Sequence, residues 1–516
     1  MPWHAGLFLF GHMVFVWYDV AGDFMYHISD LKKYARCPRA WKLDQIGEKR
    51  PFQPFVRLDE RITDLAMEKL HVTDAFIGER GDVPEKAMEA LLSCNWLVKA
   101  RFEYHDLRIK VPFLHRNEDG WELYFLFTGI YPHPDDTMFY CANLWVLEHL
   151  GLKISQIRIV HLDAGYVRGK TLDVEKLFVI SDSFYNGNNN PSVRIEPHLR
   201  KHMKDFDVLM DQMNSLGETI PEPVRSSICT GRIRCSHFEE CFGWQKMEPD
   251  NSITHLFSSQ YRYAMAEEGI DTLAKADLER IEGSRMQYAQ IQADRNGGLF
   301  VDRSALGTWL SGIHYPISFL DFEWERFAVP PYEGMKPYDV LPFEYALYIL
   351  HEDGTMEHKV YLNVHDDRRN MAENLVKDIP ETGSVVAYNA TGAESVRIRE
   401  FASLYPDLSE KLNAINARME DMQIPFITGA VYDIRMRGQW SLKVIMSMMN
   451  DASYQDLDIN QGMEAVYQWR HLDYDDDTPE EKKEKIVEDL KKYCGMDAYA
   501  MTVVYRWLVK ICKKPE

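Results

Sequence analysis

Residues 319–325 read FLDFEWE, and the alternation within this stretch sets the expected fold of the C-terminal part of the chain. Apolar and acidic side chains alternate, which is typical of a strand with one buried face. Asp321 and Glu323 would then project together, while Leu320 and Phe322 would pack on the opposite face. Two neighbouring carboxylates repel each other unless a cation or a proton compensates their charge. The stretch therefore indicates a metal site, and its structural alternative is a strand end with exposed acids.

The chain on both sides of this strand has the pattern of an α/β domain over residues 313–512. The longest helix is expected at its C-terminal end, roughly over residues 480–510. Further strands are expected at residues 343–350, 359–363 and 384–388, with a helix near residues 369–377.

Two more acids follow at positions that suit a shared site. Glu394 lies in the first turn of the helix after SVVAYN, residues 384–389. Tyr493 and Asp497 are four residues apart in YCGMD and so share one face of the closing helix. Taken singly, Glu394 is explained as a helix-terminus charge, and Tyr493 and Asp497 as ordinary core and surface residues.

Together these motifs resemble the DEDD exonucleases, the DnaQ-like branch of the ribonuclease-H-like fold. That family has a DxE on its first strand, an acid after a later strand and YxxxD on a final helix. The resemblance implies a 3′-to-5′ exonuclease that uses two Mg²⁺ or Mn²⁺ ions. The implied ligands are Asp321, Glu323, Glu394 and Asp497, while Tyr493 would orient the attacking water. Hard cations prefer oxygen ligands, and paired metals suit phosphodiester hydrolysis.

One position departs from that family. An Asp is commonly found four residues after Asn389, where this chain has Ala393 and then Glu394. A longer side chain one position later would compensate for the shift. Asp421, in ARMEDM, is a further acid expected close to the site.

The front part of the chain carries four spaced cysteines. Cys37 lies in YARCPRAW, and Cys229, Cys235 and Cys241 lie in CTGRIRCSHFEEC. They are explained either as unlinked buried thiols or as four thiolates that close one soft-metal site. One early cysteine with three late ones resembles the RecB-like nucleases that hold an iron-sulfur cluster. That resemblance implies a [4Fe-4S] cluster, with zinc as the alternative, although the spacing lacks the close CxxC pairs usual for zinc.

The catalytic residues of the RecB-like nucleases are missing from the expected front domain. Lys110 or Pro112 stands where the family has its Asp, and Phe125 and Phe127 stand where it has Glu and Lys. Asn143 replaces the helical glutamine. We therefore expect an inactive RecB-like domain that binds nucleic acid or serves as a scaffold. The two parts in this order resemble a bacterial protein family that fuses a RecB-like front to a DnaQ-like back.

Composition limits the class of protein. The 516 residues exceed what one core usually organises, so two α/β domains are expected. The formal charge of −21 argues against non-specific coating of nucleic acid, which depends on Lys and Arg. No apolar run suits a bilayer, and the start has no basic signal flank, so a cytoplasmic location without membrane contact is expected. The expected organisation is an extension (1–24), a RecB-like domain (25–245), a helical connector (246–312) and an exonuclease domain (313–512).

Three functions remain open at this point. The first is an exonuclease whose partner is a DNA or RNA substrate; protein partners have no signature in the sequence. The second is a non-catalytic nucleic-acid-binding or assembly protein with two degenerate nuclease domains. The third is a metal-dependent hydrolase of a small phosphoester.

Overall fold

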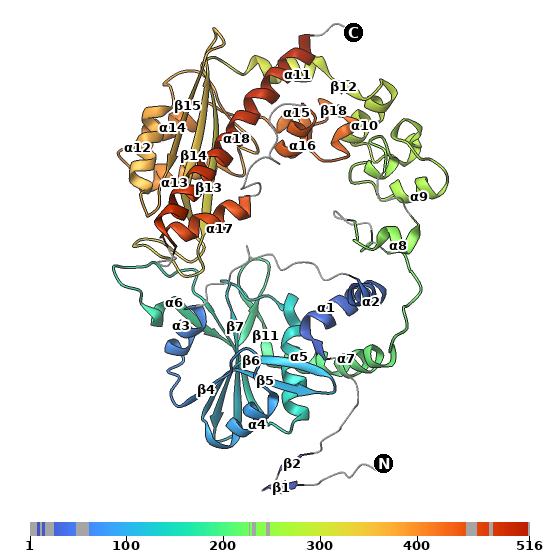
Figure 1. Ribbon diagram of the computed structural model, residues 1–516, viewed down its shortest axis with the longest axis vertical. Coiled ribbons are helices and arrows are strands. Elements are labelled where there is room, and N and C mark those ends of the chain that lie inside the picture. Colours follow the sequence, from blue (N-terminus) through green and yellow to red (C-terminus); the bar gives the residue numbers. More distant parts are fainter. Residues whose placement is uncertain are drawn as a thin grey trace. The chain divides into compact units, whose positions relative to one another are not determined.

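The computed structural model divides the chain into two compact units (Figure 1). The front unit comprises Met1–Trp244 with Phe327–Asp339, and the back unit comprises Gln245–Arg326 with Val340–Glu516. Of the expected extension, the structure describes the backbone of one hairpin, β1 (Phe8–Phe10) and β2 (Met13–Phe15). The described residues are 8–10, 13–15, 25–47, 61–226, 228–229, 234–243, 248–449, 462–473 and 478–513.

The front unit contains a seven-stranded mixed sheet in the order β4-β5-β6-β7-β8-β9, with β3 paired to β6. Strands β5, β6 and β7 are antiparallel neighbours, whereas β7 and β8 run parallel. A short hairpin of β10 (Ser183–Tyr185) and β11 (Pro191–Arg194) stands apart from the sheet. The strands of the sheet are β3 (Tyr26–His27), β4 (Ala75–Ile77), β5 (Trp96–Tyr104), β6 (Leu107–Asn117), β7 (Gly120–Phe127), β8 (Ile154–Leu162) and β9 (Phe178–Ser181).

Helices pack against both faces of this sheet. Helix α5 (Thr137–His149) is apolar on nearly all sides, and Tyr140 to Leu147 are buried between the sheet and α7 (Ile195–Ser215). Residues of α3 (Arg61–Lys69) and α6 (Val174–Leu177) belong to a second apolar cluster. The other helices are α1 (Ile28–Arg36), α2 (Pro38–Ile46), α4 (Pro84–Ser93) and α8 (Phe238–Phe242).

A segment from the C-terminal half completes the front unit. Residues Phe327–Asp339 connect two strands of the back unit, yet Val329 is buried in the same cluster as α3 and α6. The backbone N–H of Arg168 donates to the carbonyl of Met335 at 2.9 Å, and the Tyr338 hydroxyl donates to the carbonyl of Thr128 at 2.6 Å. The expected boundaries therefore change, because this segment lies inside the predicted exonuclease domain.

The back unit contains a five-stranded sheet in the order β15-β14-β13-β16-β17. Strand β13 is central: it pairs antiparallel with β14 and parallel with β16. Its ten residues include both acids of the FLDFEWE stretch. The strands are β13 (Ile317–Arg326), β14 (Val340–Leu350), β15 (Met356–Leu362), β16 (Val385–Ala387) and β17 (Met419–Asp421).

The alternation in β13 separates two apolar layers. Leu320 and Phe322 pack with α12 (Arg368–Asp378), α13 (Glu394–Leu404) and α14 (Ser409–Asn416). Phe319 packs on the other face with α18 (Glu480–Lys513), the longest helix of the described chain. The predicted strand and closing helix are both present. Asp321 and Glu323, which alternate with Leu320 and Phe322, thus face α18.

The predicted helical connector belongs to the core of the back unit. Met286 and Ala289 of α10 and Leu306 of α11 are buried in the cluster that also holds α18 residues. Strand β12, which precedes the five-stranded sheet in the sequence, pairs with β18, which follows that sheet. The boundary expected at residue 312 is therefore absent from the back unit. Other described helices and strands of the back unit, before and after its sheet in the sequence, are α9 (Arg262–Glu267), α10 (Arg285–Arg295), β12 (Leu299–Val301), α11 (Arg303–Ser311), α15 (Ile424–Ile427), β18 (Val431–Asp433), α16 (Leu442–Ser447) and α17 (Gly462–Asp473).

The expected α/β class is confirmed, with helices and several sheets distributed over two units. Within the described ranges, no helix combines the length and apolar character that a membrane span requires.

Candidate metal centre

Strand β13 fixes the first two acids of the site. Asp321 lies opposite Ala346 of β14, and Glu323 lies opposite Glu344. Both side chains keep partial exposure, whereas their neighbours Leu320 and Phe322 are buried. Strand β14 pairs with β13 along both acids, and β16 pairs with β13 at Ser318 and Phe319, so the two carboxylates are held on a rigid platform.

Helix α18 fixes the third acid. Cys494, Ala498 and other residues of one helix face are fully buried against the sheet, and Asp497 is 9% exposed. Gly495 allows the helix to approach β15, because an added Cβ would lie 3.3 Å from Nε2 of His358. The glycine in YCGMD thus permits the close packing that brings Asp497 to the strand acids.

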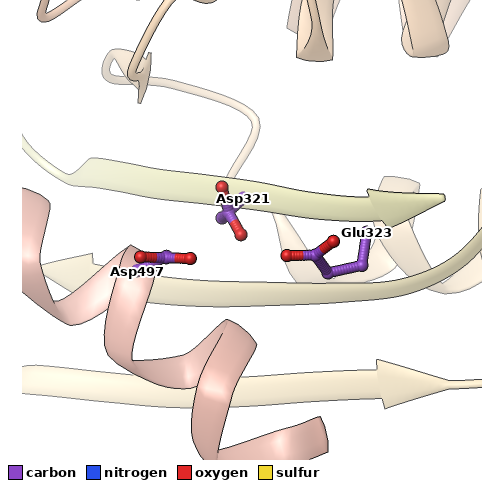
Figure 2. A group of neighbouring side chains, drawn as sticks. All are labelled: Asp321, Glu323 and Asp497. Carbon is purple, nitrogen blue, oxygen red and sulfur yellow. The ribbon is translucent and has the colours of Figure 1, made fainter. Parts of the chain in front are cut away.

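Asp321, Glu323 and Asp497 form the acid cluster. Each offers a ligand oxygen, and these oxygens all lie within 4.8 Å of one another. Figure 2 shows the carboxylates of Asp321 and Glu323 on one strand and that of Asp497 on the facing helix, all turned toward a common space. Three converging carboxylates from two elements are an oxygen donor set that suits a hard divalent cation.

The electrostatics of the cluster are unfavourable without a bound charge. Desolvation raises the pKa of Asp321 well above its usual value, and the charges of Asp497, Glu323 and Glu394 raise it further. Desolvation also raises the pKa of Glu323 well above its usual value, and the charges of Asp497 and Glu344 raise it further. Crowded carboxylates that are protonated or charge-compensated are a feature of functional sites.

Glu394 lies next to the cluster, outside the group of three that meets within 4.8 Å. It is the first residue of α13, is 3% exposed, and its Oε2 has no hydrogen-bond partner among the described residues. Burial raises its pKa to about 8. The predicted acid is therefore near the strand acids, as its effect on the pKa of Asp321 shows.

Asp421 has a structural role at this end of the sheet. Its Oδ1 accepts hydrogen bonds from the backbone N–H of Asn389 at 3.0 Å and of Gln423 at 2.9 Å. Asn389 has a positive φ of 62°, at the turn between β16 and α13. Asp421 thus stabilises the loop that leads to Glu394, and its nearby charge raises the pKa of Glu394.

Glu344, which the sequence pattern did not indicate, also lies beside the cluster. It is fully buried on β14, and neither carboxylate oxygen has a hydrogen-bond partner among the described residues. Burial raises its pKa to about 8. The acid sits within LPFEYALYI, an apolar run that conceals its pairing with Glu323. Period-two counting places it on a strand face, but only the register shows which residue it opposes.

Cys494 contacts the acid cluster directly, and Lys443 acts on it by its charge. The thiol of Cys494 donates to Oδ2 of Asp321 at 3.5 Å, and burial raises its pKa well above normal. Nζ of Lys443 donates to the hydroxyl of Tyr493 at 3.1 Å and lies 4.9 Å from the centre of its ring. Lys443 also lowers the pKa of Glu323. The predicted Tyr493 is thus linked to a lysine that the sequence pattern did not indicate.

The four predicted cluster cysteines are described at Cys37, Cys229, Cys235 and Cys241, all as free thiols. Cys235 and Cys37 both lie close enough to raise the pKa of Cys241 by their charge, after the larger effect of burial. The backbone N–H of Cys235 donates to the carbonyl of Cys229 at 3.0 Å. Among the described residues, no three of these sulfurs meet within 4.8 Å.

Strand β7 carries Phe125 and Phe127 where the resemblance would require Glu and Lys. Phe125 of β7 is fully buried in the main front cluster, and Phe127 packs against that cluster. The nearby Glu122 accepts from Tyr124 at 3.0 Å and contacts Nδ1 of His115 at 2.9 Å. Asn143 is buried and donates to the carbonyl of Phe139 at 2.8 Å. These side chains act in packing and internal pairing.

Comparison with known proteins gives one family match. A family model described as a domain of unknown function (DUF2779) matches residues 318–441. No curated protein and no solved structure matches the chain. The matched segment contains Asp321, Glu323, Glu344 and Glu394, and it ends before the helix that carries Asp497.

Proposed function

We propose that the back unit is a metal-dependent nuclease, a 3′-to-5′ exonuclease that hydrolyses phosphodiester bonds of DNA or RNA. The observation that carries the proposal is the convergence of Asp321, Glu323 and Asp497, whose ligand oxygens all lie within 4.8 Å of one another. These acids come from a strand and a helix far apart in sequence, so the cluster is a product of the fold. A solvated acidic surface would need no such convergence.

The order of elements supports a DEDD-type, ribonuclease-H-like assignment. The DxE motif is on β13, Glu394 follows β16 at the start of α13, and Tyr493 with Asp497 is on the last helix. This is the order that the resemblance implies. Polarity of cleavage rests on the resemblance, whereas the metal requirement also rests on the chemistry of the acids.

The residues present fit two Mg²⁺ or Mn²⁺ ions. Asp321, Glu323 and Asp497 supply converging oxygens, and Glu394 adds a buried oxygen that lacks a partner among the described residues. All these donors are carboxylates, which hard divalent cations prefer. Such cations lower the pKa of water and stabilise negative charge on a phosphate undergoing hydrolysis.

The chain's own groups would hold and orient the reactants. The strand acids and Asp497 keep fixed positions because β13 is central and α18 is closely packed. The Tyr493 hydroxyl, held by Lys443, would orient the attacking water by hydrogen bonding. Partial exposure of Asp321 and Glu323 leaves the cluster open to a substrate phosphate.

For the front unit we propose an inactive RecB-like domain that binds nucleic acid and holds a [4Fe-4S] cluster through Cys37, Cys229, Cys235 and Cys241. The proximity of three of these thiols supports the cluster. The spacing of the four cysteines lacks the close CxxC pairs usual for zinc, so zinc is the less suitable occupant. Free thiols throughout the chain also suit a reducing compartment such as the cytoplasm.

The proposed function is tested by degradation of single-stranded DNA and RNA by protein purified anaerobically. Strands labelled at the 5′ end should shorten stepwise in Mn²⁺ or Mg²⁺, and strands labelled at the 3′ end should release a labelled mononucleotide first. An Asp321→Ala, Glu323→Ala double variant should be inactive. Intact substrate under every cation, together with measurable binding, would establish the non-catalytic alternative.

A further inference from the structure

A lysine on a short helix contacts the tyrosine of the proposed nuclease site. Helix α16 begins after Ser441, whose side chain accepts from the backbone N–H of Val444 at 3.3 Å. Leu442 and Ile445 are buried in the core shared with α18. Lys443, between them, keeps partial exposure and donates to the Tyr493 hydroxyl at 3.1 Å. The helix therefore presents one positive charge at the border of the acid cluster.

Two other cations act on nearby acids: Lys491 lowers the pKa of Glu344, and Arg397 lowers that of Glu394. Arg397 lowers the pKa of Glu394 but is 4% exposed, lies over the ring of Trp324 and pairs with Glu400 at 2.8 Å. It is thus enclosed by the protein. Lys443 combines a direct effect on Glu323 with contact to Tyr493 and access to solvent.

The chemistry of this pair suits a phosphodiester. A hydroxyl that accepts from an ammonium group directs its own proton toward another acceptor, so the contact fixes Tyr493 as a donor. An ammonium group carries three N–H donors and can contact a tyrosine and a phosphate oxygen together. Lysine is also a common point-charge binder of phosphate. Positive charge at the rim offsets the repulsion between the acids and an incoming anion.

We propose that Lys443 is a catalytic residue that binds a non-bridging oxygen of the scissile phosphate and orients Tyr493 as a hydrogen-bond donor. This inference rests on the proposed nuclease function and assigns the phosphate-binding side chain of that site. Lys443 takes no part in holding the cations, because like charges repel.

The test uses the full chain and the p-nitrophenyl ester of thymidine 5′-phosphate, a chromogenic phosphodiester. Lys443→Ala should lower kcat/KM by about 10- to 100-fold, the loss of one charged hydrogen bond. Lys443→Arg should restore part of this loss. Lys492→Ala is the matched control: Lys492 precedes Tyr493 in the chain but lies at the surface, 3.8 Å from Glu488, and its removal should leave activity unchanged.

Two further measurements separate a catalytic role from a structural one. Mn²⁺ affinity, measured by electron paramagnetic resonance, should be equal or higher in Lys443→Ala because a positive charge has been removed. In a double-mutant cycle, the Lys443→Ala, Tyr493→Phe double variant should show a smaller fold-loss in kcat/KM than the product of the two single-variant losses, because the two residues act together.

The outcomes distinguish failure of the Lys443 role from failure of the proposed nuclease function. Wild-type kcat/KM in Lys443→Ala, weaker Mn²⁺ binding in that variant, or independent effects in the cycle would overturn the inference. Asp321→Asn is measured alongside. If it is inactive while Lys443→Ala is normal, the nuclease function stands and only the role of Lys443 falls. If Asp321→Asn keeps full activity and Mn²⁺ binding, the proposed site and this inference both fall.

Discussion

Glu323 on β13 and Glu344 on β14 lie directly opposite each other in an antiparallel pair. Opposed residues share a face of the sheet, so both carboxyls belong to the side that α18 covers. Glu344 is fully buried, and its oxygens lack partners among the described residues. A buried, unpaired acid beside a metal-ligand candidate is costly when ionised, which makes it a source of pH dependence.

The stability of the metal-free protein should fall as the pH rises. Burial raises the pKa of Glu344 to about 8 in the folded protein, against about 4.3 in an unfolded chain. The folded state therefore holds more protons, and stability is lost between about pH 4.3 and pH 8. Glu344→Gln, which stays neutral, should raise the free energy of unfolding near neutral pH by on the order of a few kcal/mol, and the melting temperature should rise with it.

Thermal melting in a chelator across this pH range checks the prediction. Glu394→Gln is the comparison, because burial raises that pKa to about 8 as well. Parallel pH profiles for Glu344→Gln and wild type would show that Glu344 contributes no proton linkage.

Cys494 should tune the cation affinity of Asp321. Its thiol donates to Oδ2 of Asp321 at 3.5 Å, and loss of a hydrogen bond to a metal-ligating carboxylate weakens binding by about tenfold or more. Cys494→Ala should therefore raise the Mn²⁺ dissociation constant, and Cys494→Ser, which retains a donor, should raise it less. Cys512→Ala on the same helix is the control. Equal Mn²⁺ affinity in all three variants would contradict this role.

Asp421 should stabilise the loop before Glu394 without binding a cation. Asp421→Ala leaves the N–H groups of Asn389 and Gln423 without their acceptor, at a cost of about 1–3 kcal/mol in unfolding free energy. Asp421→Asn retains an acceptor oxygen and should fold nearly as stably. Denaturant unfolding and Mn²⁺ titration check both parts; abolished Mn²⁺ binding in a well-folded Asp421→Asn would instead identify Asp421 as a ligand.

Val329 should be needed for the stability of the front unit, although the sequence places it between two strands of the back unit. It is 2% exposed within the apolar cluster of α3 and α6. Val329→Asp buries an unpaired charge and should cost several kcal/mol, on the order of 3 or more. Limited proteolysis with fragment mapping reports the effect. Glu333 is exposed in the same segment, so Glu333→Ala is the control. An unchanged cleavage pattern in Val329→Asp would contradict the packing of Val329.

Local patterns predicted the parts of the site that depend on one element. The alternation in FLDFEWE gave the shared face of Asp321 and Glu323, and helical spacing gave that of Tyr493 and Asp497. Glu344 escaped prediction because its importance depends on strand register, which an apolar run does not reveal. Lys443 escaped because the six residues of α16 do not determine where that helix packs.

The domain boundaries also depend on long-range contacts. Residues 246–312 show helical periodicity, but their burial against α18 is a tertiary property. Similarly, the segment Phe327–Asp339 connects two neighbouring strands of the back unit, and only its contacts with Arg168 and Thr128 assign it to the front unit. Sequence periodicity describes elements, whereas such assignments require the packed structure.

Direct binding of Mn²⁺ to the acid cluster is the measurement closest to the central claim. Wild-type protein at mildly alkaline pH, which favours the ionised form of carboxyls with raised pKa values, should bind Mn²⁺ as monitored by electron paramagnetic resonance. The Asp321→Asn, Asp497→Asn double variant, which removes two of the three converging carboxylates, should lose that binding while remaining folded. Undiminished Mn²⁺ binding in this folded variant would contradict the metal centre proposed here.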